Sequence, residues 1–178
     1  MTGCNASQQE DAMPDCGRSD SGAVLLVRQS VPTAELVPCL NHLDPGWTFL
    51  RLDAGNDRAR FRLDSDRFGD RFLEVVLEAD CDVGGAEEVP PGRDPRLPLA
   101  SDHEGTRRFV DIREIPQADN HGSRYVGAWY FRFAGGCVTY RFDAQGPDLA
   151  TLPDDVAEAL GFVPAAELDR ELREYLGD

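Results

Sequence analysis

The sequence predicts an α+β fold, an antiparallel β-sheet of about five or six strands packed on one face by N- and C-terminal helices. Apolar and charged residues alternate in short segments between residues 47 and 142, and leucines recur at helical spacing after residue 164. With 178 residues, 41% of them hydrophobic, the chain can bury one core. We expect a single globular domain over residues 22–178, after a flexible tether over residues 1–21 that contains few apolar residues.

The first part of the predicted domain combines a short apolar run with a helix. Residues 23–27 read Ala-Val-Leu-Leu-Val, which suits a buried strand or the first part of a helix. Ser30 stands two residues before Pro32, a pattern typical of a helix start. We expect this helix to reach about Leu40, with Pro38 ending it early or kinking it.

Three strands are predicted next, as a meander over residues 47–52, 58–64 and 72–79. Gly55-Asn56-Asp57 forms the first turn. The second strand has a charged face and an apolar face, made respectively of Arg58, Arg60 and Arg62 and of Ala59, Phe61 and Leu63. This alternation is typical of an antiparallel sheet with one solvated side.

The rest of the chain is predicted to add a long loop, a hairpin and two helices. Residues 82–106 contain four prolines among acidic residues and read as a long surface loop. After a fourth strand at residues 109–115, alternating aromatic residues on both sides of Gly135-Gly136 predict a tight hairpin. Near the C-terminus we expect one helix ending at Gly161 and a second that begins at Pro164 and carries a stripe of leucines.

The overall charge argues against one class of partner. The formal net charge is −15, so the averaged electrostatic field repels phosphate backbones. We therefore expect no nucleic acid partner. No segment approaches the roughly 20 consecutive apolar residues of a membrane-spanning helix, so a membrane is expected to be reached only through a lipid anchor.

The first of five cysteines stands in a motif of its own. Thr2-Gly3-Cys4 resembles the end of a bacterial lipobox, in which a small residue and Gly precede the cysteine that receives lipid. A polar stretch follows over residues 5–11, as in a flexible tether. The chain thus resembles small bacterial-type envelope lipoproteins of unknown function. The resemblance implies lipidation of Cys4 and an extracytoplasmic domain anchored to the cell membrane by its N-terminal lipid.

The other four cysteines form an even set, which predicts two structural disulfides. They are spread widely along the chain and include no Cys-x-x-Cys pair, so a zinc ribbon or a thioredoxin-type redox site is not expected. Three connectivities are possible. We favour Cys16 with Cys39, tying the N-terminal arm to the first helix, and Cys81 with Cys137, joining two strand ends.

One group of side chains suggests a binding surface on the charged face of the sheet. Arginines in this group could form a basic groove for an anionic ligand, with an aromatic residue beside them. The candidate binding residues are Arg60, Arg62, Arg132, Arg141 and Tyr130. Glu74 and Glu78 project from a neighbouring strand, however, and cross-strand pairs of arginine and glutamate are common on solvated sheet faces.

Other residues are considered for chemistry, although we predict no metal, no cofactor and no catalytic residue. Asp64, Asp66 and Asp70 offer oxygen ligands in a turn, but the spacing departs from a calcium loop. The loop residues His103 and His121 are too isolated to require a metal. Three residues apart on the predicted first helix, Cys39 and His42 could act as thiolate and base only if Cys39 is free of a disulfide.

These patterns favour a non-catalytic exported lipoprotein domain that binds an envelope ligand or protein. An alternative is a metal-assisted hydrolase that uses loop carboxylates, such as Asp64 and Asp66, with loop histidines. A third possibility is a structural partner subunit, which a large exposed hydrophobic patch would favour. The sequence identifies neither the ligand nor the oligomeric state.

Overall fold

The computed structural model describes residues 13–17, 22–90, 103–117 and 122–177. Cys4 and most of the expected tether lie outside these ranges. Among the described residues, no helix has both the length and the apolar character needed to cross a membrane. In chain order the elements are α2 (Gly22–Ser30), β1 (Leu36–Leu40), β2 (Trp47–Gly55), β3 (Arg58–Ser65), β4 (Gly69–Glu78), β5 (Glu87–Val89), β6 (Arg107–Pro116), β7 (Ser123–Phe133), β8 (Gly136–Gly146), η2 (Leu149–Thr151), α3 (Leu152–Ala159), β9 (Leu160–Pro164) and α4 (Ala165–Leu176).

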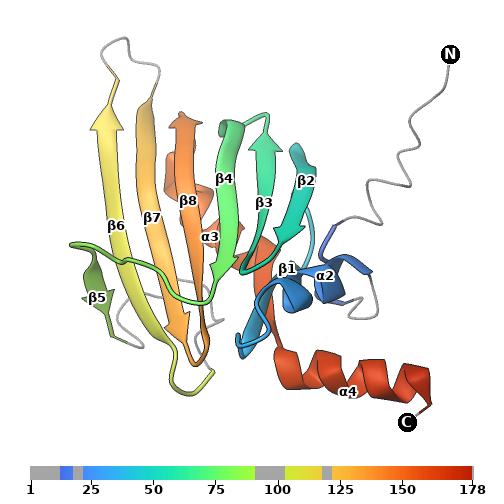
Figure 1. The fold of residues 1–178 in the computed structure, drawn as a ribbon. Helices are drawn as coiled ribbons and strands as arrows, with labels where there is room; N and C mark the ends of the chain where they lie inside the picture. Colours follow the sequence, from blue (N-terminus) through green and yellow to red (C-terminus); the bar gives the residue numbers. More distant parts are fainter. Residues whose placement is uncertain (1–12, 18–21, 91–102, 118–121, 178) are drawn as a thin grey trace, which may run out of the picture.

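The described strands form two antiparallel sheets, and together with the helices they make an α+β fold, as predicted (Figure 1). The main sheet has seven strands in the order β2-β3-β4-β8-β7-β6-β5, and β1 pairs with β9 in a second sheet of two. The prediction of five or six strands is therefore wrong, since nine strands are present among the described residues. β1, β5 and β9 are the short strands that alternation did not reveal.

The predicted helix over Ser30–Leu40 is also wrong. The helix lies earlier, in α2, and the chain then turns into β1. Pro38 lies in β1 opposite Phe162 of β9, in the ribbon of these two strands. On its other side, β1 bonds to the segment 14–16 through Leu40, which donates to the Pro14 carbonyl and accepts from the Cys16 N–H. Because proline has no N–H to donate, it suits such a short ribbon better than a helix interior.

The C-terminal region differs from its prediction because a short strand, β9, lies between its two helices. The two predicted C-terminal helices are confirmed as α3 and α4. What the prediction missed is that Gly161 lies inside the strand β9 between them, opposite Cys39. The expected cover of N- and C-terminal helices on one face is not shown, because α4 packs on β9 rather than on the main sheet. The buried residues Val27 of α2, Val37 of β1 and Val156 of α3 all join the core cluster.

The predicted hairpin is confirmed as β7 and β8. Its turn depends on Gly135, which has a positive φ of 69° and lies so close to the carbonyl oxygen of Thr33 that a Cβ would collide with it. The Thr33 hydroxyl donates a hydrogen bond of 2.7 Å to the Gly135 carbonyl. The tip of the hairpin is thereby held against the turn between α2 and β1.

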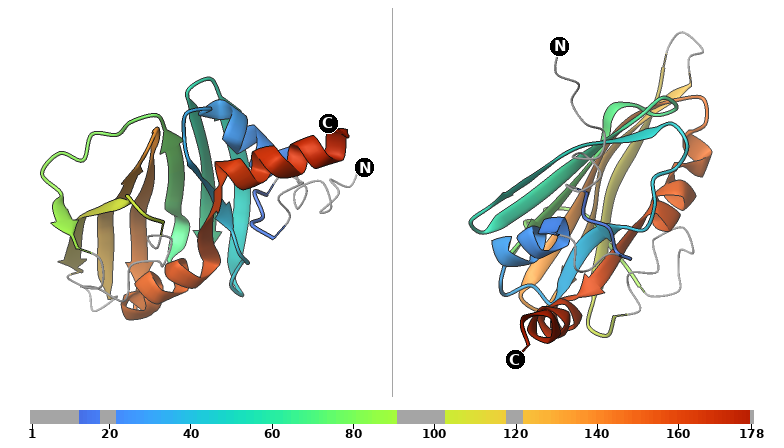
Figure 2. Two further views of the ribbon diagram at one scale, coloured as in Figure 1. Left: turned by 90° about the horizontal axis from the view of Figure 1, so that it is seen from below. Right: turned by 90° about the vertical axis from the view of Figure 1, so that its right-hand side faces the viewer.

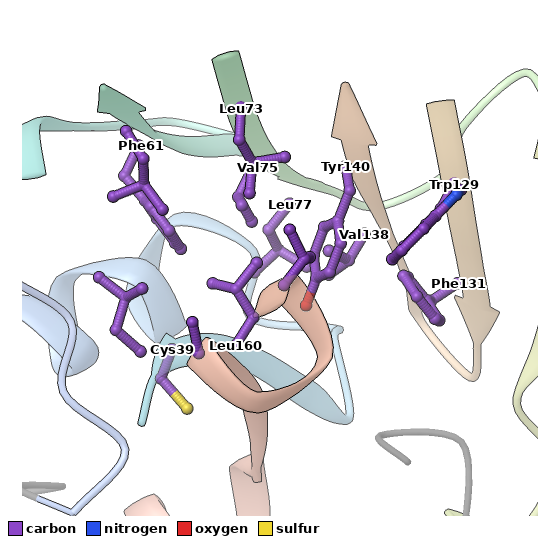
Figure 3. Close-up of a cluster of buried hydrophobic side chains, with 14 of the residues drawn as sticks. Cys39, Phe61, Leu73, Val75, Leu77, Trp129, Phe131, Val138, Tyr140 and Leu160 are labelled. Carbon is purple, nitrogen blue, oxygen red and sulfur yellow. The ribbon is translucent and has the colours of Figure 1, made fainter. Parts of the chain in front are cut away.

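One face of the main sheet, the inner face, is apolar. A register row crosses it from Phe61 of β3 through Val75 and Tyr140 to Trp129 of β7. Each of these side chains is at most 2% exposed. Figure 3 shows Tyr140 reaching toward α3 with its hydroxyl among apolar side chains. That hydroxyl has no hydrogen-bond partner among the described residues, and burial raises the pKa of Tyr140 far above its usual value.

The opposite, outer face is crossed by the segment that follows β4. Residues 79–86 run over the ends of β8 and β7 to reach β5 at the sheet edge, on the side away from α3 (Figures 1 and 2). The Cys81–Cys137 disulfide ties this segment to the first strand that it crosses, β8. The second disulfide joins Cys16 to Cys39 in β1. The favoured connectivity is confirmed, although Cys39 lies on a strand and not on a helix.

Removing each disulfide separately is expected to lower the free energy of unfolding. The bridges close segments of 56 residues for Cys81–Cys137 and 23 residues for Cys16–Cys39. Loop-closure entropy predicts losses of about 4 and about 3 kcal/mol respectively. Urea unfolding of the two paired Cys→Ala variants, compared with the unaltered protein, measures both losses. Unchanged midpoints in both variants would contradict a structural role for these bonds.

Candidate functional site

The five candidate binding residues of the sheet share its outer face, as predicted. Arg60 and Tyr130 lie in one register row across the sheet, and Arg62 and Arg141 lie in the next. Arg132 belongs to the row that contains Cys137. Tyr130 is half-buried between Phe109 of β6 and Thr139 of β8.

Each of the four arginines already has a carboxylate partner. Arg60 Nε lies 3.0 Å from Asp53 Oδ2, and Arg132 Nη2 lies 2.8 Å from Asp80 Oδ1. Arg62 Nε and Arg141 Nη1 lie 2.7 and 3.2 Å from the two oxygens of Glu74. The outer face is therefore a network of paired charges, as the cross-strand glutamates indicated, and its arginines are not free to form a basic groove.

Glu74 is the centre of this network. Burial alone would raise its pKa, but the hydrogen bond from Arg62 and the charges of Arg62, Arg141 and Arg60 outweigh that effect and hold the pKa below its usual value. Its side chain is 18% exposed. The carboxylate is therefore kept ionised by two arginines that would otherwise repel each other.

A cleft of about 420 Å³ lies elsewhere. The segments that line it include the start of α4 and the end of β7, both at the bottom of Figure 1. Five parts of the chain line it: Arg28 of α2, residues 32–36 between α2 and the start of β1, residues 103–106 before β6, Phe133 at the end of β7, and the start of α4. These parts are far apart in sequence. The docking of the hairpin tip on the α2–β1 turn brings two of them together.

Two residues that line the cleft each have one buried polar atom without a hydrogen-bond partner among the described residues. Arg28 donates from Nη1 to the Pro32 carbonyl at 2.7 Å and from Nη2 to Asp169 at 3.1 Å, but its buried Nε has no partner. The buried hydroxyl of Thr106 has none either. Buried polar groups are almost always hydrogen-bonded in folded proteins, so these two atoms are exceptions. Both are shielded from solvent and lie beneath the open surface of the cleft.

The rim of the cleft is acidic. The carboxylates of Glu35 and Glu104 line it, both residues are exposed, and neither makes an ion pair among the described residues. Asp169 is already paired with Arg28. The charges of Glu35 and Glu104 are therefore uncompensated, in contrast to the paired glutamate at the centre of the outer face.

The residues considered for metal or acid–base chemistry are not brought together. Asp64 accepts a hydrogen bond from the backbone of Arg71 in the β3–β4 turn. His42 contacts Asp44 at 2.9 Å, His103 lines the cleft, and His121 lies outside the described residues. No group of three potential metal ligands is present in the described part of the chain. The pairing of Cys39 as thiolate with His42 as base is wrong, because Cys39 is in a disulfide.

The chain matches no protein-family model, no curated protein and no solved structure. The cleft is therefore identified as the candidate site from its geometry alone. Sequence reasoning missed Arg28, Glu35 and Thr106, because no motif or spacing links residues so far apart in the chain. Only the loop pair His103-Glu104 gave a signal that these positions carry polar chemistry.

Replacing Glu74 with Gln is expected to lower the free energy of unfolding at neutral pH by roughly 1 kcal/mol, because Arg62 and Arg141 lose their shared counter-ion. Since the pKa of Glu74 is lowered by folding, its stabilising effect is present above the unfolded pKa and is lost as the pH falls through the folded pKa. Urea unfolding between pH 7 and pH 3 should therefore show a smaller loss of stability on acidification in the variant.

The matched control is Glu158→Gln, an exposed glutamate of α3 that makes no ion pair among the described residues. Its pH profile should follow that of the unaltered protein. Identical profiles for both variants would show that the Glu74 network contributes nothing to stability.

Proposed function

We propose that this chain is a non-catalytic, ligand- or partner-binding domain of an exported lipoprotein, held at the outer side of the cytoplasmic membrane by a lipid on Cys4. The two disulfides suggest an extracellular or otherwise oxidising compartment, because reducing conditions in the cytosol keep most thiols free. The lipobox-like Thr2-Gly3-Cys4 supports the anchor.

The observation that carries the binding role is the cleft between the α2–β1 turn and the start of α4. Its volume of about 420 Å³ lies in the range of small-molecule sites. It combines apolar side chains, such as Phe133 and Leu36, with the exposed residues Glu35 and Glu104. Apolar walls with a few polar groups are the usual composition of a site that binds a ligand and orients it.

The cleft is a better candidate than the outer face of the sheet. An anionic ligand on the outer face would have to displace carboxylates that already contact Arg60, Arg62 and Arg141 at 2.7 to 3.2 Å. Desolvating and separating such pairs costs free energy before any ligand contact is made. The cleft instead offers apolar walls and two carboxylates, those of Glu35 and Glu104, that make no ion pair among the described residues.

A screen of small-molecule fragments by NMR is expected to shift the backbone amides of residues 33–36, 103–106 and 165–167 in the oxidised protein. The Ala166→Trp variant should lose these shifts, because Ala166 is an exposed residue that lines the cleft. Ala150→Trp changes an exposed alanine in η2 and should not. Hits that map only to Tyr130 and the arginines of the outer face, or no hits at all, would contradict a binding role for the cleft.

The anchor is tested separately in cells that express the protein with a bacterial lipoprotein leader. We expect the mature protein in the membrane fraction, with the mass of an acyl modification on the peptide that contains Cys4. Cys4→Ala should release it from the membrane, and the control Ser7→Ala in the same polar stretch should not. An unmodified Cys4 thiol in the membrane-bound protein would refute lipidation.

A further inference from the structure

We infer that two copies of this chain form a symmetric dimer in which the edge strand β2 pairs antiparallel with β2 of the second copy, with Leu52 at the two-fold axis. This interface is separate from the cleft and does not depend on the ligand-binding role proposed for it. Three features support the dimer: an open sheet edge, a pair of charges that complements itself, and the absence of this pattern at the other edge of the sheet.

The edge of β2 is open to a partner strand. β2 ends the main sheet on the side opposite β5, and among the described residues it pairs only with β3 (Figures 1 and 2). Outside that pairing, no backbone hydrogen bond between described residues involves the stretch 50–54. The side chain of Arg51 is 61% exposed, and Ala54 is exposed as well. The outward N–H and C=O groups of such an edge are a template for another strand.

The charges along this edge are complementary to themselves. Arg51 and Asp53 lie two residues apart on the outer face. They lie opposite Arg62 and Arg60 of β3, respectively. A two-fold axis perpendicular to the sheet keeps both outer faces on the same side, so residues of the outer face come opposite each other. When Leu52 lies opposite Leu52 of the second copy, Arg51 lies opposite Asp53 of the second copy, and this pair occurs twice.

The charge pattern selects one register. A shift of the second copy by two residues brings either the two copies of Arg51 or the two copies of Asp53 opposite each other, and like charges in that position are destabilising. A shift by one residue would put outer-face side chains opposite inner-face ones, which antiparallel pairing does not allow. In the favoured register, the two partly buried copies of Leu52 meet on the inner face and lose exposed apolar surface.

Forming the dimer requires Arg51 to exchange its partner. Within one chain, Arg51 Nη2 lies 2.7 Å from Asp53 Oδ1, in a pair that is well exposed on the arginine side. Exposed pairs of this kind contribute little, so the exchange costs little. Asp53 keeps its contact with Arg60 at 3.0 Å.

The other edge of the main sheet lacks this pattern. β5 already pairs with residues 108–110 of β6, which leaves residues 111–116 of that strand. Self-pairing centred in this stretch brings Arg113 or Glu114 opposite its own copy, and like charges again oppose each other. The two edges therefore differ in their capacity to bind a second copy, and β6 supplies a control for β2.

The dimer should be weak, because the β-bulge between Phe49 and Arg51 limits the paired stretch to residues 50–54. The test is sedimentation equilibrium of the oxidised full chain between about 10 μM and about 1 mM. At roughly 0.15 M salt, repulsion between two copies of net charge −15 is screened beyond about 8 Å. We expect dimers at the higher concentrations. NMR should then show shifted amides at residues 50–54 with slower hydrogen exchange.

Charge reversal tests the register. Arg51→Asp and Asp53→Arg each put like charges opposite one another, so each should weaken dimerisation at least about tenfold. An equimolar mixture of the two variants puts opposite charges at both positions, so a heterodimer should form and restore the shifts at residues 50–54. Its formation also shows that both variants fold. Arg113→Asp reverses an exposed charge at the other edge and should dimerise like the unaltered protein.

Several results overturn the inference. One is a protein that stays monomeric at about 1 mM. Another is a dimer whose amides at residues 50–54 do not change, because a different surface would then hold it together. Undiminished dimerisation of Arg51→Asp, or a mixture of variants that does not associate, refutes the register. A monomer whose edge amides shift only with an unrelated extended peptide shows that β2 pairs with another chain and not with a second copy.

Discussion

Burial of the inner face of the main sheet is the interaction on which the rest of this structure depends. Phe61, Val75 and Tyr140 are held in one register row by antiparallel pairing and expose almost nothing to solvent. Their burial requires a second layer, which α2, the β1–β9 ribbon and α3 provide together. The energy of this core is sufficient to keep the Tyr140 hydroxyl buried without a partner, a cost of a few kcal/mol at most.

The need to cover the inner face of the main sheet also places charged residues in two different environments. On the outer face, arginines and carboxylates from neighbouring strands are close enough to pair, and Glu74 with Arg62 and Arg141 is the clearest case. At the lower edge of the sheet, where the second layer ends in turns and in the first residues of α4, Glu35 and Glu104 make no ion pair among the described residues. A chain with a net charge of −15 thus has one balanced surface and one cleft whose acidic rim is uncompensated.

The cleft is a consequence of how the layers meet and not of a single loop. The β7–β8 hairpin tip can approach the α2–β1 turn only because Gly135 carries no side chain. The backbone bond from Ala165 to the Glu35 carbonyl, 2.8 Å long, attaches the start of α4 to the same turn. These contacts fix the positions of Arg28 and Glu35 relative to Phe133, so the cleft is built on rigid elements, which favours a preformed site.

The sequence alone determined the antiparallel meander and the β7–β8 hairpin, because alternation with period two reports directly which residues face a core. It also predicted that four of the cysteines form two disulfides, and the structure contains both. Only the tertiary structure decided the β1–β9 ribbon, the edge strand β5 and the meeting of Arg28, Glu35 and Thr106 around one cleft. Short strands such as β1 carry no distinctive period, and contacts between distant residues depend on packing, which local pattern cannot report.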